Sequence, residues 1–181
     1  MCNHSCHRRP TRRKVLGGLA GGAAAIGLGT GRGRAAAGAA VVDLPPPGPS
    51  DTCPVCGMFV ARYPEWVATA LFDDGHADHF DGAKDFFKYL FDMEKYALGR
   101  TEDQIAGLGV TEYYGLKLIE AKAALYVAGS DVLGPMGHEL IPLRDDVDAG
   151  DYMKDHRGKL LLRFDEVTPE LLVKLDAGAA L

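Results

Sequence analysis

The spacing of hydrophobic positions changes along the chain, and these changes separate candidate strands from candidate helices. Residues 66–72, WVATALF, have the β-branched and aromatic content of a strand, and the turn signal DDG at 73–75 leads into a second strand, HADHF. Apolar residues then recur at helical spacing, which predicts an amphipathic helix that begins near Asp81 or Gly82. The apolar stripe of this helix, which we assign to the core, consists of Ala83, Phe86, Phe87, Leu90 and Phe91.

The second half of the chain shows a similar order of elements. Its expected elements are a strand at 121–130, a loop at 131–139, a short strand at 140–143, a helix at 146–156 and a strand at 159–167. A last helix begins at Thr168, because Thr is a favourable N-cap and Pro169 a favourable first helical residue. Each half also has a methionine in a glycine-flanked loop. We therefore predict an α+β fold made of two similar small units with a shared interface, at about 53–118 and 119–181.

The first 40 residues have the features of an export signal and are excluded from the fold. A basic region containing Arg12 and Arg13 precedes a Gly/Ala-rich apolar stretch and small residues, which is close to a twin-arginine pattern. A generic secretory signal and an uncleaved signal anchor are the alternatives, although the apolar stretch is short for a membrane span. We expect a bacterial periplasmic protein, with a Pro-rich linker at 41–52 that is extended and poorly packed.

The charge balance changes once the signal is set aside. Removing residues 1–40 takes away seven Arg and Lys residues and no acidic residue, so the formal charge falls from -5 to -12. An acidic domain lacks the basic footprint that nucleic acid requires, so we expect no nucleic-acid partner. The charge is compatible with a cation as cargo or with a basic partner surface.

Three sulfur-containing side chains lie within six residues of one another. Cys53 and Cys56 are the only cysteines outside the signal, and Met58 follows them after a glycine. Met136 lies in GPMGHE, between glycines, which is unusual for a residue that normally fills gaps in a core. Thiolates and thioethers are soft donors that favour Cu(I). The cluster is therefore a candidate Cu(I) site.

Other chemistries are open to the same cysteines. Zinc could be held as a structural Cys2His2 set with His76 and His79, although residues three apart on a strand point to opposite faces. A thiol-disulfide oxidoreductase could use Cys53 and Cys56, but its redox pair normally opens a helix, and here residues 58–63, MFVARY, are predicted to form a strand. A structural disulfide is the third alternative.

Several motifs, in order, resemble those of the NosL family of nitrous oxide reductase accessory proteins. They are CPVCGMFVARYPEW, FDDG, FDGAKDFFKY, ALYVAGSDVLGPMGHELIPL and GKLLLRFDEV. The resemblance implies a periplasmic Cu(I)-binding metallochaperone, not an enzyme, with two similar ββαβ units and a fold related to that of organomercurial lyases. It also implies delivery of copper to nitrous oxide reductase with the help of a maturation transporter, in denitrifying respiration.

The resemblance also implies a set of metal-binding residues. Its C-G-M core places Cys56 and Met58 at the copper site, the G-P-M-G loop adds Met136, and Cys53 and His138 are further candidates. His76 and His79 are not implied. Family members commonly carry a lipid on a cysteine at the signal cleavage point, and this chain has none there. We therefore expect no lipid anchor, with membrane contact only through the signal or a partner.

Overall fold

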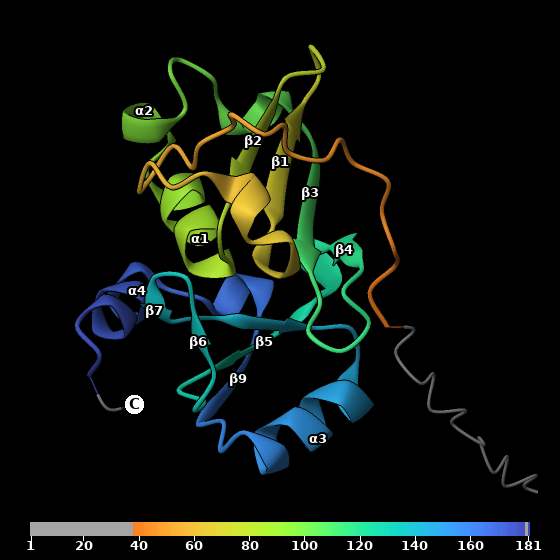
Figure 1. Cartoon of the computed structure of the whole chain (residues 1–181), viewed down its shortest axis with the longest axis vertical. Helices are drawn as coiled ribbons and strands as arrows, with labels where there is room; N and C mark the ends of the chain where they lie inside the picture. The colour runs from red at the N-terminus through yellow and green to blue at the C-terminus, as the bar shows by residue number, and fades with distance from the viewer. Residues whose placement is uncertain (1–37, 180) are drawn as a thin grey trace, which may run out of the picture. The chain divides into compact units, whose positions relative to one another are not determined.

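The described part of the chain builds two larger antiparallel sheets and a two-stranded hairpin, with helices packed against the larger sheets (Figure 1). The structure is a computed structural model that describes residues 38–179 and 181, so the predicted twin-arginine-like signal lies almost wholly outside the described residues. The strands are β1 (Ala68–Phe72), β2 (Ala77–Phe80), β3 (Ile105–Thr111), β4 (Leu118–Glu120), β5 (Leu125–Ala128), β6 (Leu133–Gly134), β7 (Gly137–His138), β8 (Ile141–Leu143) and β9 (Leu160–Arg163). The α-helices are α1 (Ala83–Phe91), α2 (Met93–Tyr96), α3 (Asp146–Asp155) and α4 (Pro169–Asp176).

The two sheets repeat one topology. The first has the strand order β2-β1-β3-β4 and the second β8-β5-β9, so in each unit the first strand lies between the second and the third. Helix α1 follows β2 in the first unit, and α3 follows β8 in the second. The first unit adds β4 at one edge, and the second inserts the β6-β7 hairpin before β8. The predicted α+β class with two similar ββαβ-type units is confirmed.

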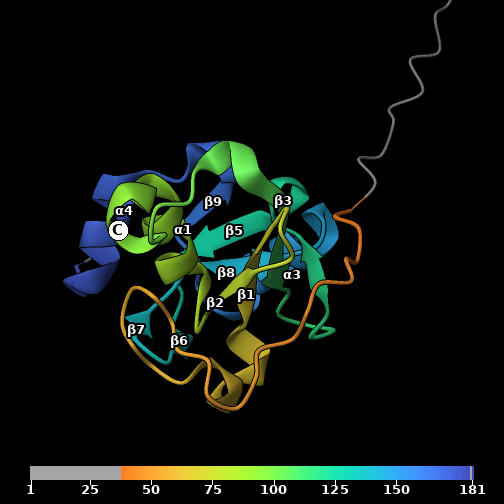
Figure 2. The ribbon, with the colours of Figure 1, turned by 90° about the horizontal axis from the view of Figure 1, so that it is seen from above.

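Helix α1 supplies much of the core that the two units share. Phe86 and Phe87 are fully buried, and the Phe87 ring centroid lies 5.0 Å from those of both Tyr126 and Phe164 in the second unit. Figure 2 shows α1 and α4 side by side, and the two helices are in contact. The predicted interface and the core role of Phe86 and Phe87 are confirmed. The core assignment is wrong for Phe91, which is 46% exposed.

Some elements differ from those predicted. The strands at 121–130 and 159–167 are shorter because 3-10 turns flank them, and residues 58–63 contain a 3-10 turn rather than a strand. Strands β3 and β4 were not predicted at all. Gly107 and Gly109 interrupt the alternation of apolar and polar residues by which β3 could have been recognised. A Cβ on Gly109 would come within 2.9 Å of side-chain atoms of both Leu44 and Leu118. Glycine is needed there because two leucines fill the space.

The chain before Cys53 is partly integrated into the first unit. Val41 bridges to Ile119 in β4, and the Val42 amide donates to the Leu118 carbonyl at 2.9 Å. Leu44 of the Pro-rich linker packs against the β3 glycines, so the expectation of a poorly packed spacer is wrong at that point. The linker also turns near its end, where the Asp51 amide donates to the Gly48 carbonyl at 3.1 Å. Among the helices of the described chain, none has the length and apolarity needed to cross a membrane.

We expect Phe87→Ala to lower the free energy of unfolding by about 3–5 kcal/mol, because it leaves a cavity between the two sheets. Phe91→Ala is the matched control on the same helix and should cost about 1 kcal/mol or less, since its ring is half exposed. Urea unfolding followed by circular dichroism measures both. Equal losses in the two variants would contradict a core that joins the units through Phe87.

Candidate metal centre

A closed turn at residues 52–59 holds both cysteines. Thr52 and Phe59 form an antiparallel bridge, the Cys53 amide donates to the Met58 carbonyl at 2.9 Å, and the Gly57 amide donates to the Cys53 carbonyl at 2.8 Å. Gly57 has a φ of 79°, a conformation that other residues rarely adopt. These constraints turn the backbone sharply enough for the two sulfur atoms to face the same region.

Two aspartates that were not predicted as site residues lie beside the cysteines and form a cluster with them. Asp81 precedes α1 and Asp85 lies in its first turn. The Cys56 thiol donates to Asp81 Oδ1 at 3.2 Å, and Cys53 Sγ lies 3.7 Å from Asp85 Oδ2. One ligand atom from each of the four residues lies within 4.8 Å of the others. The sequence signal that could have found them is their spacing: Asp81 and Asp85 are four residues apart at the start of a helix, which places both side chains on one face.

The surroundings of the cysteines favour protonated thiols. Cys53 is buried, and burial raises the pKa of its thiol far above the usual range, with the nearby Asp85 charge acting in the same direction. Burial also raises the pKa of Cys56 to about 12, and its hydrogen bond to Asp81 adds to the effect. A metal ion that binds here must therefore displace thiol protons.

One carboxylate oxygen in the cluster has no hydrogen-bond partner. Asp81 is 2% exposed, and within the described chain its buried Oδ2 atom contacts no donor. A buried polar atom without a partner is costly, and such atoms often mark functional sites. The donor set of two sulfurs and two carboxylates, with one oxygen unsatisfied, therefore fits a cation.

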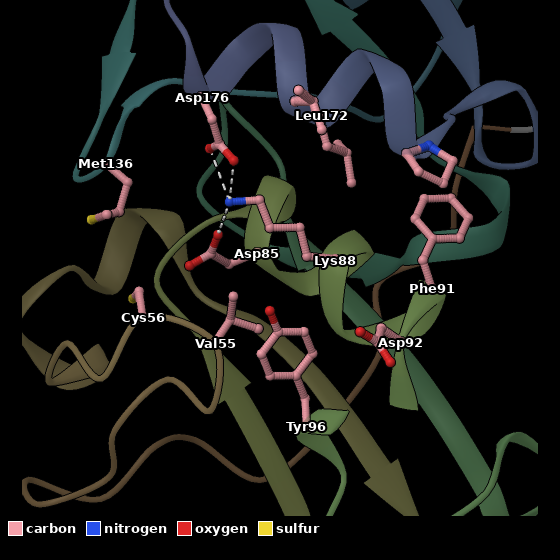
Figure 3. A pocket seen from close by; sticks show the side chains of 12 residues that line it. Val55, Cys56, Asp85, Lys88, Phe91, Asp92, Tyr96, Met136, Leu172 and Asp176 are labelled. Atoms are coloured by element: carbon pink, nitrogen blue, oxygen red, sulfur yellow. Dashed lines mark hydrogen bonds and ion pairs between the residues drawn. The ribbon is translucent and has the colours of Figure 1, made fainter. Parts of the chain in front are cut away.

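The cluster opens into a groove of about 780 Å³ that also reaches Met136. In Figure 3, Cys56 and Met136 lie at the same end of this groove, Tyr96 lies beside Val55 in the middle, and Phe91 lies at the other end. Met136 lies in the turn of the β6-β7 hairpin and is 46% exposed. The fold therefore brings the Met136 loop of the second unit to the cysteine turn of the first.

The other predicted ligands take different places. Met58 is half-buried directly after Gly57, and its side chain is not among those that line the groove. His138 is half-buried at the end of β7, where its ring Cδ2 lies 3.6 Å from the position of a Cβ on Gly178. The structure thus brings Cys53, Cys56 and Met136 to one region, while His138 faces the end of α4.

The histidines of the zinc hypothesis do not join the cysteines. His76 is exposed and contacts Asp78 at 3.0 Å, whereas His79 is buried, with its Nδ1 atom 3.0 Å from Thr69 Oγ1. Neither belongs to the metal-compatible cluster found in the described chain. The Cys2His2 arrangement is therefore absent from residues 38–179.

The cysteine environment is also opposite to that of a redox-active pair. Such thiols have lowered pKa values at the start of a helix, whereas here both pKa values are raised and the cysteines lie in a turn before a 3-10 segment. Both cysteines are free thiols in this structure, which is compatible with metal binding.

We expect Cys56 to react slowly with iodoacetamide at pH 8, because each unit by which its pKa exceeds the pH lowers the thiolate fraction about tenfold. Asp81→Asn removes the negative charge beside Cys56, so it should lower the pKa of Cys56 and speed alkylation. Asp92→Asn, an exposed groove position outside the cluster, is the control. Peptide mass spectrometry measures the rates, and slower reaction in Asp81→Asn would contradict this assignment.

Comparisons with known proteins agree with this architecture. A family model described as NosL matches residues 46–172. The chain is also similar to the crystal structure of the copper chaperone NosL from Shewanella denitrificans, with a TM-score of 0.59 and 24% sequence identity over 71% of this chain and 97% of that chain. At this level of sequence identity, the similarity to the crystal structure shows a shared fold. No curated protein matches the chain significantly. Because the family match covers well over half of the sequence, including the cysteine turn and the Met136 hairpin, the chain belongs to the NosL family.

Proposed function

We propose that this protein is a Cu(I) carrier, not an enzyme, that delivers copper for the assembly of nitrous oxide reductase. The observation that carries the proposal is the clustering of Cys53 and Cys56 with two aspartates at the end of an open groove. One of these aspartates, Asp81, has a buried carboxylate oxygen without a partner in the described part of the chain. Membership of the NosL family and the fold shared with a copper chaperone support it.

The donor set favours copper in its lower oxidation state. Cu(I) is a soft ion that prefers thiolates and thioethers. Cys56 and Met136 provide such sulfur atoms at one end of the groove, and Cys53 provides another in the cluster beside Cys56. Met58, which lies in the same turn as the cysteines, and His138 are further candidate donors. The carboxylates of Asp81 and Asp85 are hard donors, so their proposed roles are to attract the cation and to accept protons.

Loading the site exchanges protons for the metal. The Cys56 thiol already donates to Asp81 Oδ1, so when Cu(I) bonds to the sulfur, the thiol proton has an acceptor at 3.2 Å. One proton leaves for each thiol that becomes a copper ligand. Affinity for Cu(I) should therefore rise with pH as long as the thiols of the metal-free protein are protonated.

Release requires a route for the ligands of the recipient. Cys56 is half-buried and Met136 is 46% exposed, so a partner side chain can approach the metal from the groove before the donor ligands leave. A carrier benefits from this exposure because copper passes by ligand exchange without becoming free. We propose that the recipient system is nitrous oxide reductase with its maturation transporter, in the periplasm, after export directed by residues 1–40.

We expect the reduced protein to compete for Cu(I) with a chromogenic chelator in an anaerobic titration. Cys56→Ser should remove this competition, and Met58→Leu and Met136→Leu should each weaken it by roughly 10–100-fold, the range typical of altered metal surroundings. Met153→Leu makes the same chemical change in the packing around α3 and serves as the control.

The same titration with Zn(II) separates the proposal from a structural zinc site. Weak zinc binding, with a melting temperature that does not respond to a chelator, supports the carrier. Tight zinc binding that raises the melting temperature, together with failure to compete for Cu(I), would refute it. Disulfide reductase activity that disappears in Cys53→Ser would favour the oxidoreductase alternative instead.

Delivery is tested in cells that produce nitrous oxide reductase and depend on this protein as their accessory factor. We expect the reductase purified from cells with Cys56→Ser to contain less copper than the reductase from wild-type cells, because the variant cannot hold the cargo. His76→Ala, an exposed substitution outside the cluster, is the control. Copper is measured by mass spectrometry, and full loading in the Cys56→Ser cells would count against delivery.

A further inference from the structure

Lys84 is a buried lysine that connects helix α1 to the Met136 loop. Its side chain is 1% exposed, and its Nζ atom donates to the carbonyls of Met136 at 3.1 Å and His138 at 2.8 Å. The same atom lies 3.2 Å from Asp176 Oδ1 in α4. A lysine ammonium has three N–H donors, so these three acceptors match its full capacity.

The hairpin that carries Met136 is too short to fix its own position. Each of its strands, β6 and β7, has two residues, and longer isolated two-stranded hairpins are marginal in water. The two carbonyls that accept from Lys84 belong to Met136 in the turn and His138 in β7, on either side of Gly137. Lys84 therefore anchors the side of the hairpin that positions Met136.

A second contact joins the same two segments, with a side chain next to the hairpin accepting from the backbone of α1. Glu139, which directly follows β7, is fully buried, and its carboxylate accepts hydrogen bonds from the backbone amides of Lys84 at 2.5 Å and Leu140 at 2.9 Å. Gly82 lies against this carboxylate, with no space for a Cβ. The hairpin segment thus holds the start of α1, while α1 holds the hairpin.

From this geometry we infer that Lys84 is a positioning residue that acts through Met136, keeping its sulfur at the cysteine end of the groove. The inference rests on the proposed Cu(I) function. Lys84 does not touch the cargo, because its donors are occupied by the two carbonyls and Asp176.

Charge pairing alone does not account for the burial of this lysine. Asp176 is 45% exposed and is shared with Lys88 at 2.8 Å, so its charge is partly screened by water and divided between two lysines. Burying an ammonium group is costly unless it is well hydrogen-bonded. The two hairpin carbonyls provide that hydrogen bonding, which links the position of Lys84 to the conformation of the loop.

A double-mutant cycle on the full chain tests the inference. Cu(I) affinity is measured by chelator competition for the wild type, Lys84→Met, Met136→Leu and the double variant. We expect each single variant to lose about tenfold in affinity and the double variant to lose no more than Met136→Leu, because coupled residues are not additive. Independent losses that add in the double variant, or an unchanged affinity in Lys84→Met, would overturn the inference.

Hydrogen exchange without copper provides a readout that does not depend on the cargo. Lys84→Met should speed amide exchange at residues 136–138. Lys88→Met should not speed it, because Lys88 donates to Asp85 and Asp176 rather than to the hairpin carbonyls, although the variant also removes a positive charge beside Asp176. Unchanged exchange in Lys84→Met would overturn the anchoring role. If Lys84→Met does not fold, Lys84→Arg takes its place in both experiments, because the longer planar group cannot reproduce three converging donors.

The two experiments separate this inference from the proposed function. A wild-type protein that does not bind Cu(I) refutes the carrier proposal, while faster exchange in Lys84→Met would still support the anchoring of the loop. A Met136→Leu variant with wild-type affinity would overturn the role of Lys84 in the metal site and leave binding by the cysteines intact.

Discussion

The start of helix α1 is the constraint on which the rest of the structure depends. The buried Glu139 carboxylate of the second unit accepts a hydrogen bond from the Lys84 backbone amide of the first unit. The carboxylate fits there because Gly82 has no Cβ. Burial raises the pKa of Glu139 to about 8, so this contact carries a desolvation cost that its amide donors and the nearby Lys84 charge only partly offset. This contact fixes the start of α1. The helix provides Phe86 and Phe87 to the core, Asp85 to the metal-compatible cluster and Lys84 to the Met136 hairpin.

The duplicated topology divides the candidate site between the two units. The first unit contributes the cysteine turn and both carboxylates, and the second contributes Met136 on an inserted hairpin. A site assembled across a shared core needs that core to be stiff, and the aromatic packing of Phe87 against the second sheet joins the units near α1. The open groove beside Met136 leaves the same site accessible from outside. Rigidity within the units and access between them suit a carrier that must bind and release.

The local sequence signals were sufficient where structure follows from short-range patterns. The hairpin after residue 66, the amphipathic helix α1 and the N-cap at Thr168 were predicted correctly, because alternation, helical spacing and capping are encoded by neighbouring residues. The family was predicted correctly from the resemblance of its motifs. Strand β3 was missed because its glycines make room for Leu44, a contact between segments more than 60 residues apart. Such a strand has no local pattern to recognise.

The sequence by itself determined that three sulfur-containing side chains lie close together along the chain, since Cys53, Cys56 and Met58 fall within six residues. Only the tertiary structure decided what surrounds those thiols: Asp81 and Asp85 lie 25 and 32 residues after the cysteines they contact, and the histidines of the zinc hypothesis lie elsewhere. The physical reason is that burial, charge and hydrogen bonding depend on which segments the fold brings together, and a thiol acquires its pKa from those neighbours.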